Sequence, residues 1–491
     1  MYTKLLYDYL VDCECCKYCV LRYLKPRYEE LLCVEKAFEK RKLGHEKLKI
    51  NDLNEKKQKL NPCVICFGLF ENIDSIILKV KEDERLNNYE IDKFLSGFSL
   101  PVLLELTQLQ MWLALIEKFP EHISKENTPD VPIKDAIKYI INDRLEKELK
   151  KEFDVEGILI GINFSIENEH EALSKLDEVA PELMNERNKQ KKRFRTEVIS
   201  RNYFCKHFTP TSIDITKFQK LIPIPPKVPT APIKFDEIAI TGPTIFLAGR
   251  YNKYSRDLSQ TPWFVGGKKL SDLSVEEIIV SSILPHFKVS ESSVTFMSSG
   301  REDVDVRCLG KGRPFVLEIM NTTKTILDKT LAKEMEAKVC QSGVVSIRDV
   351  QLVKRDDLHA IKSGEQDKKK YYRALCTLRD NDIINEEMLV KLEINESFDI
   401  QQWTPLRVLH RRTLMKRTRT VHSVKAHAVK DKHNLIVLDF VTQAGTYIKE
   451  LVHGEFGRTA PSISSLINRD IDIISLDVMN IDLDFPPSTQ T

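Results

Sequence analysis

The chain has 491 residues, of which 42% are hydrophobic and 30% are charged, a composition typical of folded globular proteins. A chain of this length is too long to fold around one ordinary hydrophobic core, which predicts two or three domains. The formal net charge of +2 excludes a uniformly basic protein, although single segments are strongly asymmetric in charge.

No segment has the pattern of a membrane span or a secretory signal. The longest apolar stretches are interrupted well before the ~18 residues that a span requires. Asp8, Asp12 and Glu14 interrupt the apolar start of the chain, so we expect no signal peptide. We therefore expect an intracellular protein of the nucleus, the cytoplasm or both, without membrane contact.

Cysteines are concentrated near the N-terminus, where seven of the eleven fall within the first 66 residues. Without a secretory signal, this clustering indicates metal binding rather than disulfides. Two C-x-x-C pairs, Cys16 with Cys19 and Cys63 with Cys66, would supply the four thiolates of a tetrahedral structural zinc site. Cys13 forms a competing pair with Cys16, and buried free thiols or a redox pair are the alternatives.

The rest of the first half alternates between helix and strand patterns. Leu103 to Phe119 predicts a core helix, 133–152 a second helix and Gly157 to Phe164 a strand. The basic run from Arg187 to Arg195 suits either an RNA-facing patch or a solvated helix end. Five prolines between Ile222 and Pro232 prevent a helix and predict an extended connector, so we place the domain boundary near them.

Beyond the connector, two segments combine cations with aromatic residues. Gly249 to Arg256 interleaves three cations with two tyrosines, a combination suited to phosphate contact and base stacking. Thr261 to Lys269 predicts a basic loop that carries Trp263. An exposed turn without function is the alternative for each segment.

The densest charge cluster is Gly300 to Arg307, which holds three acids and two arginines. Turn-forming residues flank it on both sides and predict a loop, and Phe315 to Met320 predicts a buried strand behind it. A carboxylate held by arginines on such a loop suits covalent or acid–base chemistry. The alternative is a solvated charged turn.

Three later segments also carry chemical groups. Lys368 to Cys376 places Tyr372 in a strand, where its ring either lies against a planar group or packs at the sheet. Eight cations and no acid occur from Arg407 to Lys430, which favours contact with a polyanion. Gln443 to Gly454 predicts a strand end and then a helix carrying Lys449, which by pattern alone suits a solvated charge.

Several of these segments together resemble a known enzyme family. GREDVDVR, KKYYRAL and AGTYIKEL occur in this order and resemble the three signature motifs of pseudouridine synthases. Within the pseudouridine synthases, the chain most resembles the archaeal and eukaryotic tRNA enzymes that act on uridines 54 and 55 of the T arm. The segments that carry this resemblance are GRYNKYSRDLSQTPW, TPLRVLHRR and HGEFGRTAPS. The two C-x-x-C pairs, with Arg22 after the first, resemble the zinc-bearing, THUMP-containing domain of that family and favour Cys16 over Cys13 as a ligand.

The resemblance implies roles for individual residues. Asp303 matches the nucleophilic aspartate, Tyr372 the tyrosine that stacks on the flipped base, and Lys449 the basic residue that pairs with the nucleophile. Leu451 would lie beneath the base. The other residues implied in substrate contact are Arg301, Trp263, Tyr447, Arg407, Arg411 and Arg412. Glu455 departs from the aspartate expected before the Gly-Arg-Thr run.

We therefore predict an α+β protein of two domains. Residues 1–235 would form a zinc-bearing, THUMP-type α/β accessory domain that binds RNA. Residues 236–491 would form the pseudouridine synthase domain, with a mixed, antiparallel-rich sheet, flanking helices and a cleft across its face. The implied activity is isomerisation of T-arm uridine in tRNA, with structural zinc and no catalytic cofactor. A non-catalytic RNA-binding protein on the same scaffold is the main alternative, and a zinc-dependent hydrolase is a third.

Overall fold

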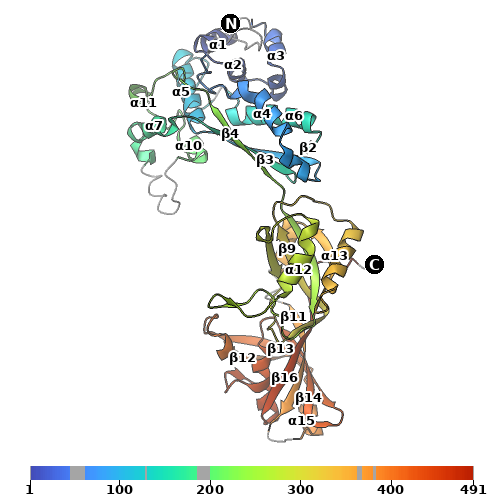
Figure 1. The fold of residues 1–491 in the computed structure, drawn as a ribbon. Helices are drawn as coiled ribbons and strands as arrows, with labels where there is room; N and C mark the ends of the chain where they lie inside the picture. Colours follow the sequence, from blue (N-terminus) through green and yellow to red (C-terminus); the bar gives the residue numbers. More distant parts are fainter. Residues whose placement is uncertain are drawn as a thin grey trace. The chain divides into compact units, whose positions relative to one another are not determined.

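The computed structural model describes residues 2–44, 61–127, 130–184, 199–361, 368–379 and 383–489. The basic run from Arg187 to Arg195 lies outside the described residues. The chain divides into two compact units, Met1–Gly242 and Pro243–Thr491, and each has its own apolar core (Figure 1). Among the described helices, none is long and apolar enough to cross a membrane.

The first unit is built on a four-stranded sheet in the order β2-β1-β3-β4. β1 (Lys93–Ser99) pairs in parallel with β2 (Glu152–Phe153) and β3 (Ile158–Ser165), and β4 (Lys234–Thr241) pairs antiparallel with β3. Buried residues alternate with less buried ones along β3, as a strand with one covered face requires. The predicted strand at Gly157 to Phe164 is confirmed.

Helices supply most of the first unit's core. α5 (Leu103–Lys118) buries side chains on nearly every side, which confirms the predicted core helix. α6 (Ile133–Leu149) ends earlier than predicted because Lys150 adopts a left-handed conformation, and β2 follows it. Further helices of this unit are α1 (Tyr2–Asp12), α2 (Lys17–Tyr23), α3 (Val34–Lys40), α4 (Ile73–Lys81), α7 (Glu169–Ser174), α8 (Leu176–Val179), α10 (Arg201–His207) and α11 (Ile215–Leu221).

The proline-rich segment belongs to the first unit rather than linking the two. Ile222 and Ile233 at its ends are buried in this unit's core, and the Gln110 side chain donates a 2.7 Å hydrogen bond to the carbonyl of Pro223. The predicted boundary between residues 235 and 236 falls inside β4. Because β4 completes the first sheet, the units separate only after Gly242.

The second unit holds a ten-stranded sheet in the order β10-β5-β9-β16-β11-β14-β13-β12-β15, with β8 beside β9. Its strands are β5 (Ile245–Lys253), β8 (Val294–Ser298), β9 (Arg307–Ile319), β10 (Val345–Val353), β11 (Lys369–Leu378), β12 (Phe398–Trp403), β13 (Lys416–Val429), β14 (Lys432–Gln443), β15 (Thr459–Ala460) and β16 (Ile471–Ile481). Among the strand pairs described for this sheet, β9 with β16 is parallel and the others are antiparallel. The predicted α+β class with an antiparallel-rich sheet is confirmed.

Short helices and one hairpin complete the second unit. The helices include α12 (Val275–Ile283), α13 (Lys329–Cys340), α15 (Glu386–Leu392), α16 (Ile448–His453) and α17 (Ile463–Ile467), and a small hairpin is formed by β6 (Phe264–Val265) and β7 (Lys268–Lys269). α13 packs on β10, and α16 packs on β16. The predicted order of a strand, a turn and a helix carrying Lys449 is confirmed by β14 and α16.

Candidate active site

Asp303 lies in the loop of residues 299–306 that joins β8 to β9, as predicted, but Arg307 and the downstream turn-forming residues 309–314 lie within β9. Gly300 opens this loop with a φ of +83°, and a Cβ atom there would lie 3.0 Å from Nζ of Lys370 and 3.1 Å from Nη1 of Arg313. The loop therefore requires glycine at this position. The Asp303 side chain is 32% exposed, so a ligand can reach its carboxylate.

A buried ion pair anchors the loop next to Asp303. Arg313 Nε donates to Glu302 at 2.8 Å, and the two side chains are 2% and 0% exposed. The Tyr251 hydroxyl also donates to Glu302 at 2.8 Å, and Arg313 Nη1 donates to the carbonyl of Ser299 at 2.7 Å. Buried charges need such partners, and together they fix the backbone on the N-terminal side of Asp303.

Lys253, at the end of β5, fastens the same loop from within. Its side chain is fully buried, and its ammonium donates to the carbonyls of Leu258 at 2.7 Å, Val304 at 2.8 Å and Asp303 at 3.1 Å. Burial lowers the pKa of Lys253 despite the acids nearby. Lys253 therefore holds the main chain of Asp303, whereas Arg407 and Lys449 face its side chain.

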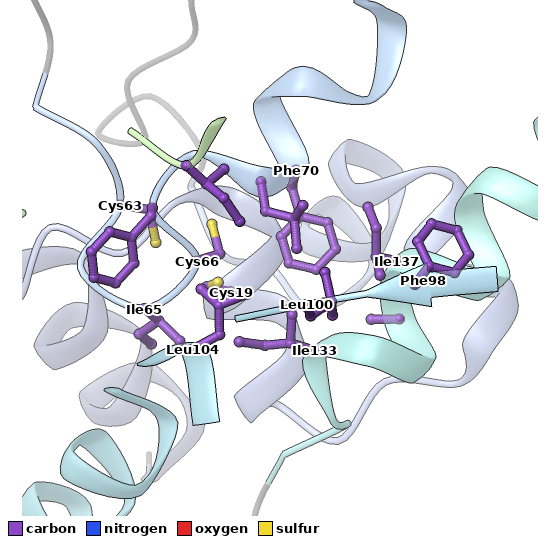
Figure 2. Packing of buried hydrophobic residues seen from close by; sticks show 14 of the residues in the cluster. Cys19, Cys63, Ile65, Cys66, Phe70, Phe98, Leu100, Leu104, Ile133 and Ile137 are labelled. Atoms are coloured by element: carbon purple, nitrogen blue, oxygen red, sulfur yellow. The ribbon is translucent and has the colours of Figure 1, made fainter. Parts of the chain in front are cut away.

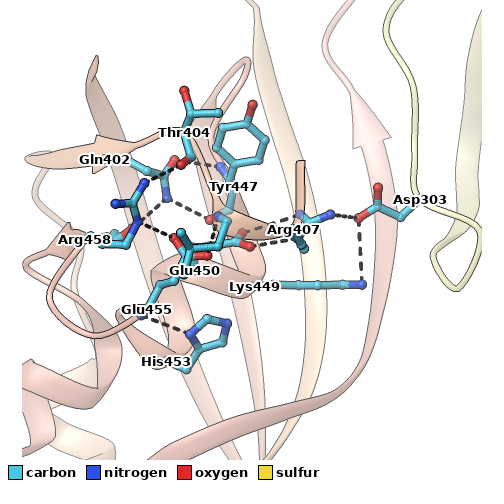
Figure 3. Close-up of polar contacts among 12 residues, drawn as sticks. Asp303, Gln402, Thr404, Arg407, Tyr447, Lys449, Glu450, His453, Glu455 and Arg458 are labelled. Atoms are coloured by element: carbon cyan, nitrogen blue, oxygen red, sulfur yellow. Dashed lines mark hydrogen bonds and ion pairs between the residues drawn. The ribbon is translucent and has the colours of Figure 1, made fainter. Parts of the chain in front are cut away.

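Two cations face the carboxylate of Asp303 (Figure 3). Arg407 Nη1 donates to its Oδ2 at 2.8 Å, and Lys449 Nζ lies 3.8 Å from the same oxygen. Lys449 makes its hydrogen bonds to Asp305 instead, at 2.7 and 2.9 Å. Lys449 therefore lies within ion-pair distance of Asp303, as expected, but it is shared with a second carboxylate.

Charge pairing around Asp303 favours the ionised forms of Asp305 and Arg407. Burial alone would raise the pKa of Asp305, but the hydrogen bonds and charge of Lys449 outweigh burial and lower it. Burial would likewise lower the pKa of Arg407, and Glu450 and Asp303 outweigh it and raise the pKa. Asp305 and Arg407 are consequently both charged at neutral pH.

Glu450 on α16 anchors Arg407. Arg407 Nε donates to Glu450 at 2.7 Å, and the Glu450 side chain is only 1% exposed. Gln402 fixes the start of α16, since its amide accepts from the backbone N–H of Tyr447 at 2.9 Å and donates to the Tyr447 carbonyl at 3.0 Å. One short helix therefore positions Lys449 directly and Arg407 through Glu450 (Figure 3).

Tyr372 lies on β11, which is flanked by β14 and β16 within the sheet. Burial raises the pKa of Tyr372 to about 12, so its ring is neutral at physiological pH. Tyr372 lies opposite Val478 of β16, and Val478 lies opposite Cys308 of β9, just after the Asp303 loop. Its side chain is partly exposed and offers a flat, neutral surface for a planar base.

Four cysteines meet in the first unit. Three of them, Cys19, Cys63 and Cys66, are packed among buried apolar side chains such as Ile65 (Figure 2). The sulfur atoms of Cys16, Cys19, Cys63 and Cys66 all lie within 4.8 Å of one another, and those of Cys16 and Cys66 are 3.7 Å apart. Metal–sulfur bonds of about 2.3 Å in a tetrahedron would separate the sulfurs by about 3.8 Å. The cluster therefore fits a structural metal ion.

Arg22 lies against this cysteine cluster. Its side chain is fully buried, with Nη1 3.7 Å from the sulfur of Cys19 and Nη2 3.1 Å from a carboxylate oxygen of Asp130. Four thiolates around a divalent ion retain net negative charge, which a guanidinium in the second layer offsets.

Comparison with known proteins connects this chain to one family. Two family profiles match it, described as "Pus10, C-terminal" over residues 246–482 and "Eukaryotic Pus10, N-terminal" over residues 63–240. A Pus10 protein of Drosophila melanogaster is 43% identical over 98% of this chain and 97% of its own length. The chain belongs to the Pus10 family.

Other members of the Pus10 family match different extents of the chain. The tRNA pseudouridine synthase Pus10 of Xenopus laevis is 33% identical over 98% of this chain and 97% of its own length. The tRNA pseudouridine synthase Pus10 of Pyrococcus furiosus is 36% identical over 48% of this chain and 57% of its own length. Among solved structures, a Cbf5-Nop10-Gar1 complex is similar over 47% of both chains at 16% identity, with a TM-score of 0.26.

The other residues predicted to contact substrate lie in three places of this Pus10 chain. Arg301 is exposed two residues before Asp303, and Arg411 and Arg412 are exposed in the loop of residues 404–415 between β12 and β13. Trp263 is 39% exposed beside the small hairpin. Their contacts with RNA remain predictions.

Tyr447 and Leu451 both belong to the α16 region but differ in exposure. Tyr447 is partly exposed at the start of the helix. Leu451 has no exposed surface and packs in the core of the second unit, so its observed contacts support the helix. The expectation that it lies beneath a base remains a prediction.

Four residues of the site were not recognised from the sequence in the roles that the structure gives them. Arg407 was grouped with RNA contacts, yet it is the hydrogen-bond partner of Asp303. Asp305, Glu450 and Lys253 were not singled out, although each holds a charged group or the loop itself. A signal was present for Glu450, an acid that directly precedes the apolar pair Leu451 and Val452.

Proposed function

We propose that this protein isomerises uridine to pseudouridine in the T arm of tRNA, at position 54, position 55 or both. One observation carries the proposal: in a chain of the Pus10 family, Asp303 presents an accessible carboxylate between Arg407 and Lys449. The substrate follows from relatives named tRNA pseudouridine synthase. A tRNA substrate implies an intracellular protein, of the nucleus, the cytoplasm or both.

Asp303 acts at the ribose of the target nucleotide. The reaction breaks the bond between N1 of uracil and C1′ of the ribose, turns the base and joins C5 to C1′, while C5 loses a proton and N1 gains one. Asp303 serves as the nucleophile at C1′ or, in the competing mechanism, as the base that takes a ribose proton. Arg407 and Lys449 orient the carboxylate.

Tyr372 receives the flipped base. Taking a base out of its stack costs a few kcal/mol. Stacking on an aromatic ring returns roughly 1–3 kcal/mol, and a neutral phenol adds no charge beside Asp303. Arg301, Trp263, Tyr447, Arg411 and Arg412 contact the surrounding RNA, and Leu451 supports the base from the core.

The metal held by the four cysteines is zinc in a structural role. Four thiolates in tetrahedral proximity suit zinc, and they leave no open position for a substrate. The metal therefore stabilises the first, THUMP-type accessory unit. The isomerisation itself requires no cofactor.

The replacement Asp303→Asn tests the function directly. It keeps the size of the side chain but removes the charge that does the chemistry. We expect no tritium release from unmodified tRNA labelled at C5 of uridine, while tRNA affinity stays within a few-fold of wild type. Wild-type protein that binds tRNA but releases no tritium would instead support the non-catalytic RNA-binding alternative.

A further inference from the structure

Phe456 is the most exposed large apolar side chain of the described residues, with 97% of its surface accessible. It lies in the turn between α16 and β15. Four consecutive residues of this turn have positive φ: Gly454 at 78°, Glu455 at 42°, Phe456 at 56° and Gly457 at 81°. A bulky side chain is rare in this conformation, and glycine would adopt it without strain.

Folding does not explain a phenylalanine at this position. The ring buries no area in the core, and the left-handed backbone opposes any residue with a Cβ. Strained, exposed residues of this kind cluster at binding and catalytic sites, where the surrounding structure holds them in place. The position therefore favours a role toward a partner.

Hydrogen bonds join the turn to the loop of residues 404–415 (Figure 3). Glu455 accepts from the backbone N–H of Leu406 at 2.9 Å and from Arg458 Nε at 3.2 Å. Arg458 also donates to the carbonyl of Thr404 at 2.7 Å. Since Leu406 directly precedes Arg407, the base of the Phe456 turn is joined to the segment that contacts Asp303.

The surroundings of Phe456 favour RNA over protein as its partner. The adjoining loop of residues 404–415 exposes Arg411 and Arg412, and no acid occurs from Arg407 to Lys430. A cationic surface with an isolated ring suits a nucleic acid, whose phosphates meet the cations while a base stacks on the ring.

We propose that Phe456 stacks on a base of the bound tRNA other than the base that Tyr372 receives. It is a second aromatic contact, fixed to the segment that carries Arg407. The inference rests on the proposed function because it takes tRNA as the substrate. The hydrogen bonds of Glu455 hold the backbone of the turn, so less backbone entropy is lost on binding.

Replacements that separate aromatic from merely apolar character test this proposal. In the full-length protein, Phe456→Leu is expected to weaken binding of an unmodified tRNA transcript about tenfold, whereas Phe456→Tyr keeps affinity within about twofold. Phe456→Gly should also weaken binding while the thermal unfolding temperature is unchanged or higher, because it relieves the left-handed strain. Val390→Ala, at a side chain 68% exposed on α15, serves as the control and should leave affinity unchanged.

Wild-type affinity in Phe456→Leu would overturn the stacking contact and would leave a protein partner as the reason for the exposed ring. This outcome differs from failure of the proposed function, in which wild-type protein binds tRNA without releasing tritium. Because the stacking readout is affinity, it does not depend on turnover.

Discussion

Arg407 is the side chain that connects the candidate nucleophile to the interior of the second unit. It donates to Asp303 at 2.8 Å and to Glu450 at 2.7 Å, and Glu450 is almost fully buried. A guanidinium can bind two carboxylates at once because its donors form a fixed planar fork. Arg407 thereby connects the carboxylate of Asp303 to α16 and helps to fix its position.

Replacing Arg407 should affect chemistry more than binding. We expect Arg407→Ala to lower kcat about a hundredfold or more, the usual scale for removing one preorganised charge partner. Arg407→Lys keeps the charge but not the fork, so its kcat should fall between Ala and wild type. Single-turnover rates at saturating tRNA measure this effect.

The paired replacement Arg411→Ala with Arg412→Ala serves as the comparison for Arg407. Those exposed cations should contribute to affinity and to its salt dependence, with kcat largely retained. If Arg407→Ala changed only the salt dependence of binding, its place beside Asp303 would have no catalytic consequence.

The sequence singled out Asp303, Tyr372 and Lys449 through the resemblance of their motifs to pseudouridine synthases, and their roles in catalysis stay predictions. It could not predict the contact between Asp303 and Arg407, whose positions are 104 residues apart in the chain. Nor could it show that Lys449 is shared with Asp305, since the distances of 2.7 and 3.8 Å depend on how α16 packs. Local pattern identifies the groups, and tertiary packing decides which of them meet.

The element that positions the Asp303 loop is strand β5, whose residues are all buried. Tyr251 and Lys253 point to the same face of the strand because side chains alternate along it. Tyr251 holds Glu302, and Lys253 holds the carbonyls of Asp303 and Val304. In the sequence, the same segment looked like an RNA-binding surface because cations and tyrosines alternate in it. In the structure, Tyr251 and Lys253 are instead buried and form hydrogen bonds within the second unit.

Replacing Lys253 should therefore destabilise the loop. Lys253→Met keeps the length of the side chain but leaves buried carbonyls without a donor, a loss of about 1–3 kcal/mol for an unpaired buried polar group. We expect lower thermal stability of the second unit and a reduced kcat, measured by calorimetry and tritium release. The control is Lys338→Met, which changes an exposed lysine on α13 and should alter neither quantity. Wild-type stability and kcat in Lys253→Met would show that the loop is held without this ammonium.

At the scale of the whole molecule, the cysteine cluster that fits a metal ion and the candidate active site lie in different units. The cysteine cluster lies in the core of Met1–Gly242, and Asp303, Arg407, Tyr372 and Lys449 all lie in Pro243–Thr491. That the chain forms more than one unit was predictable from its length. The boundary was not, because pairing of β4 with β3 is a contact between residues far apart in the chain.

Removing the metal should therefore affect the two units unequally. We expect one zinc per full-length chain by elemental analysis. Structural zinc sites in small domains contribute roughly 10–16 kcal/mol of apparent binding free energy, so replacing Cys63 and Cys66 together by serine should lower the unfolding temperature of the first unit strongly. The second unit has its own core, so its unfolding temperature should stay near that of wild type.

Enzyme kinetics give an independent test of whether loss of the metal affects only the first unit. For Cys63→Ser with Cys66→Ser, KM for tRNA should rise because the accessory unit no longer binds RNA, whereas kcat at saturating tRNA should stay within a few-fold. Cys205→Ser is the matched control, because Cys205 is an exposed cysteine of the same unit outside the cluster. If a zinc-free first unit unfolded at the wild-type temperature, the metal would make no contribution to the stability of this unit.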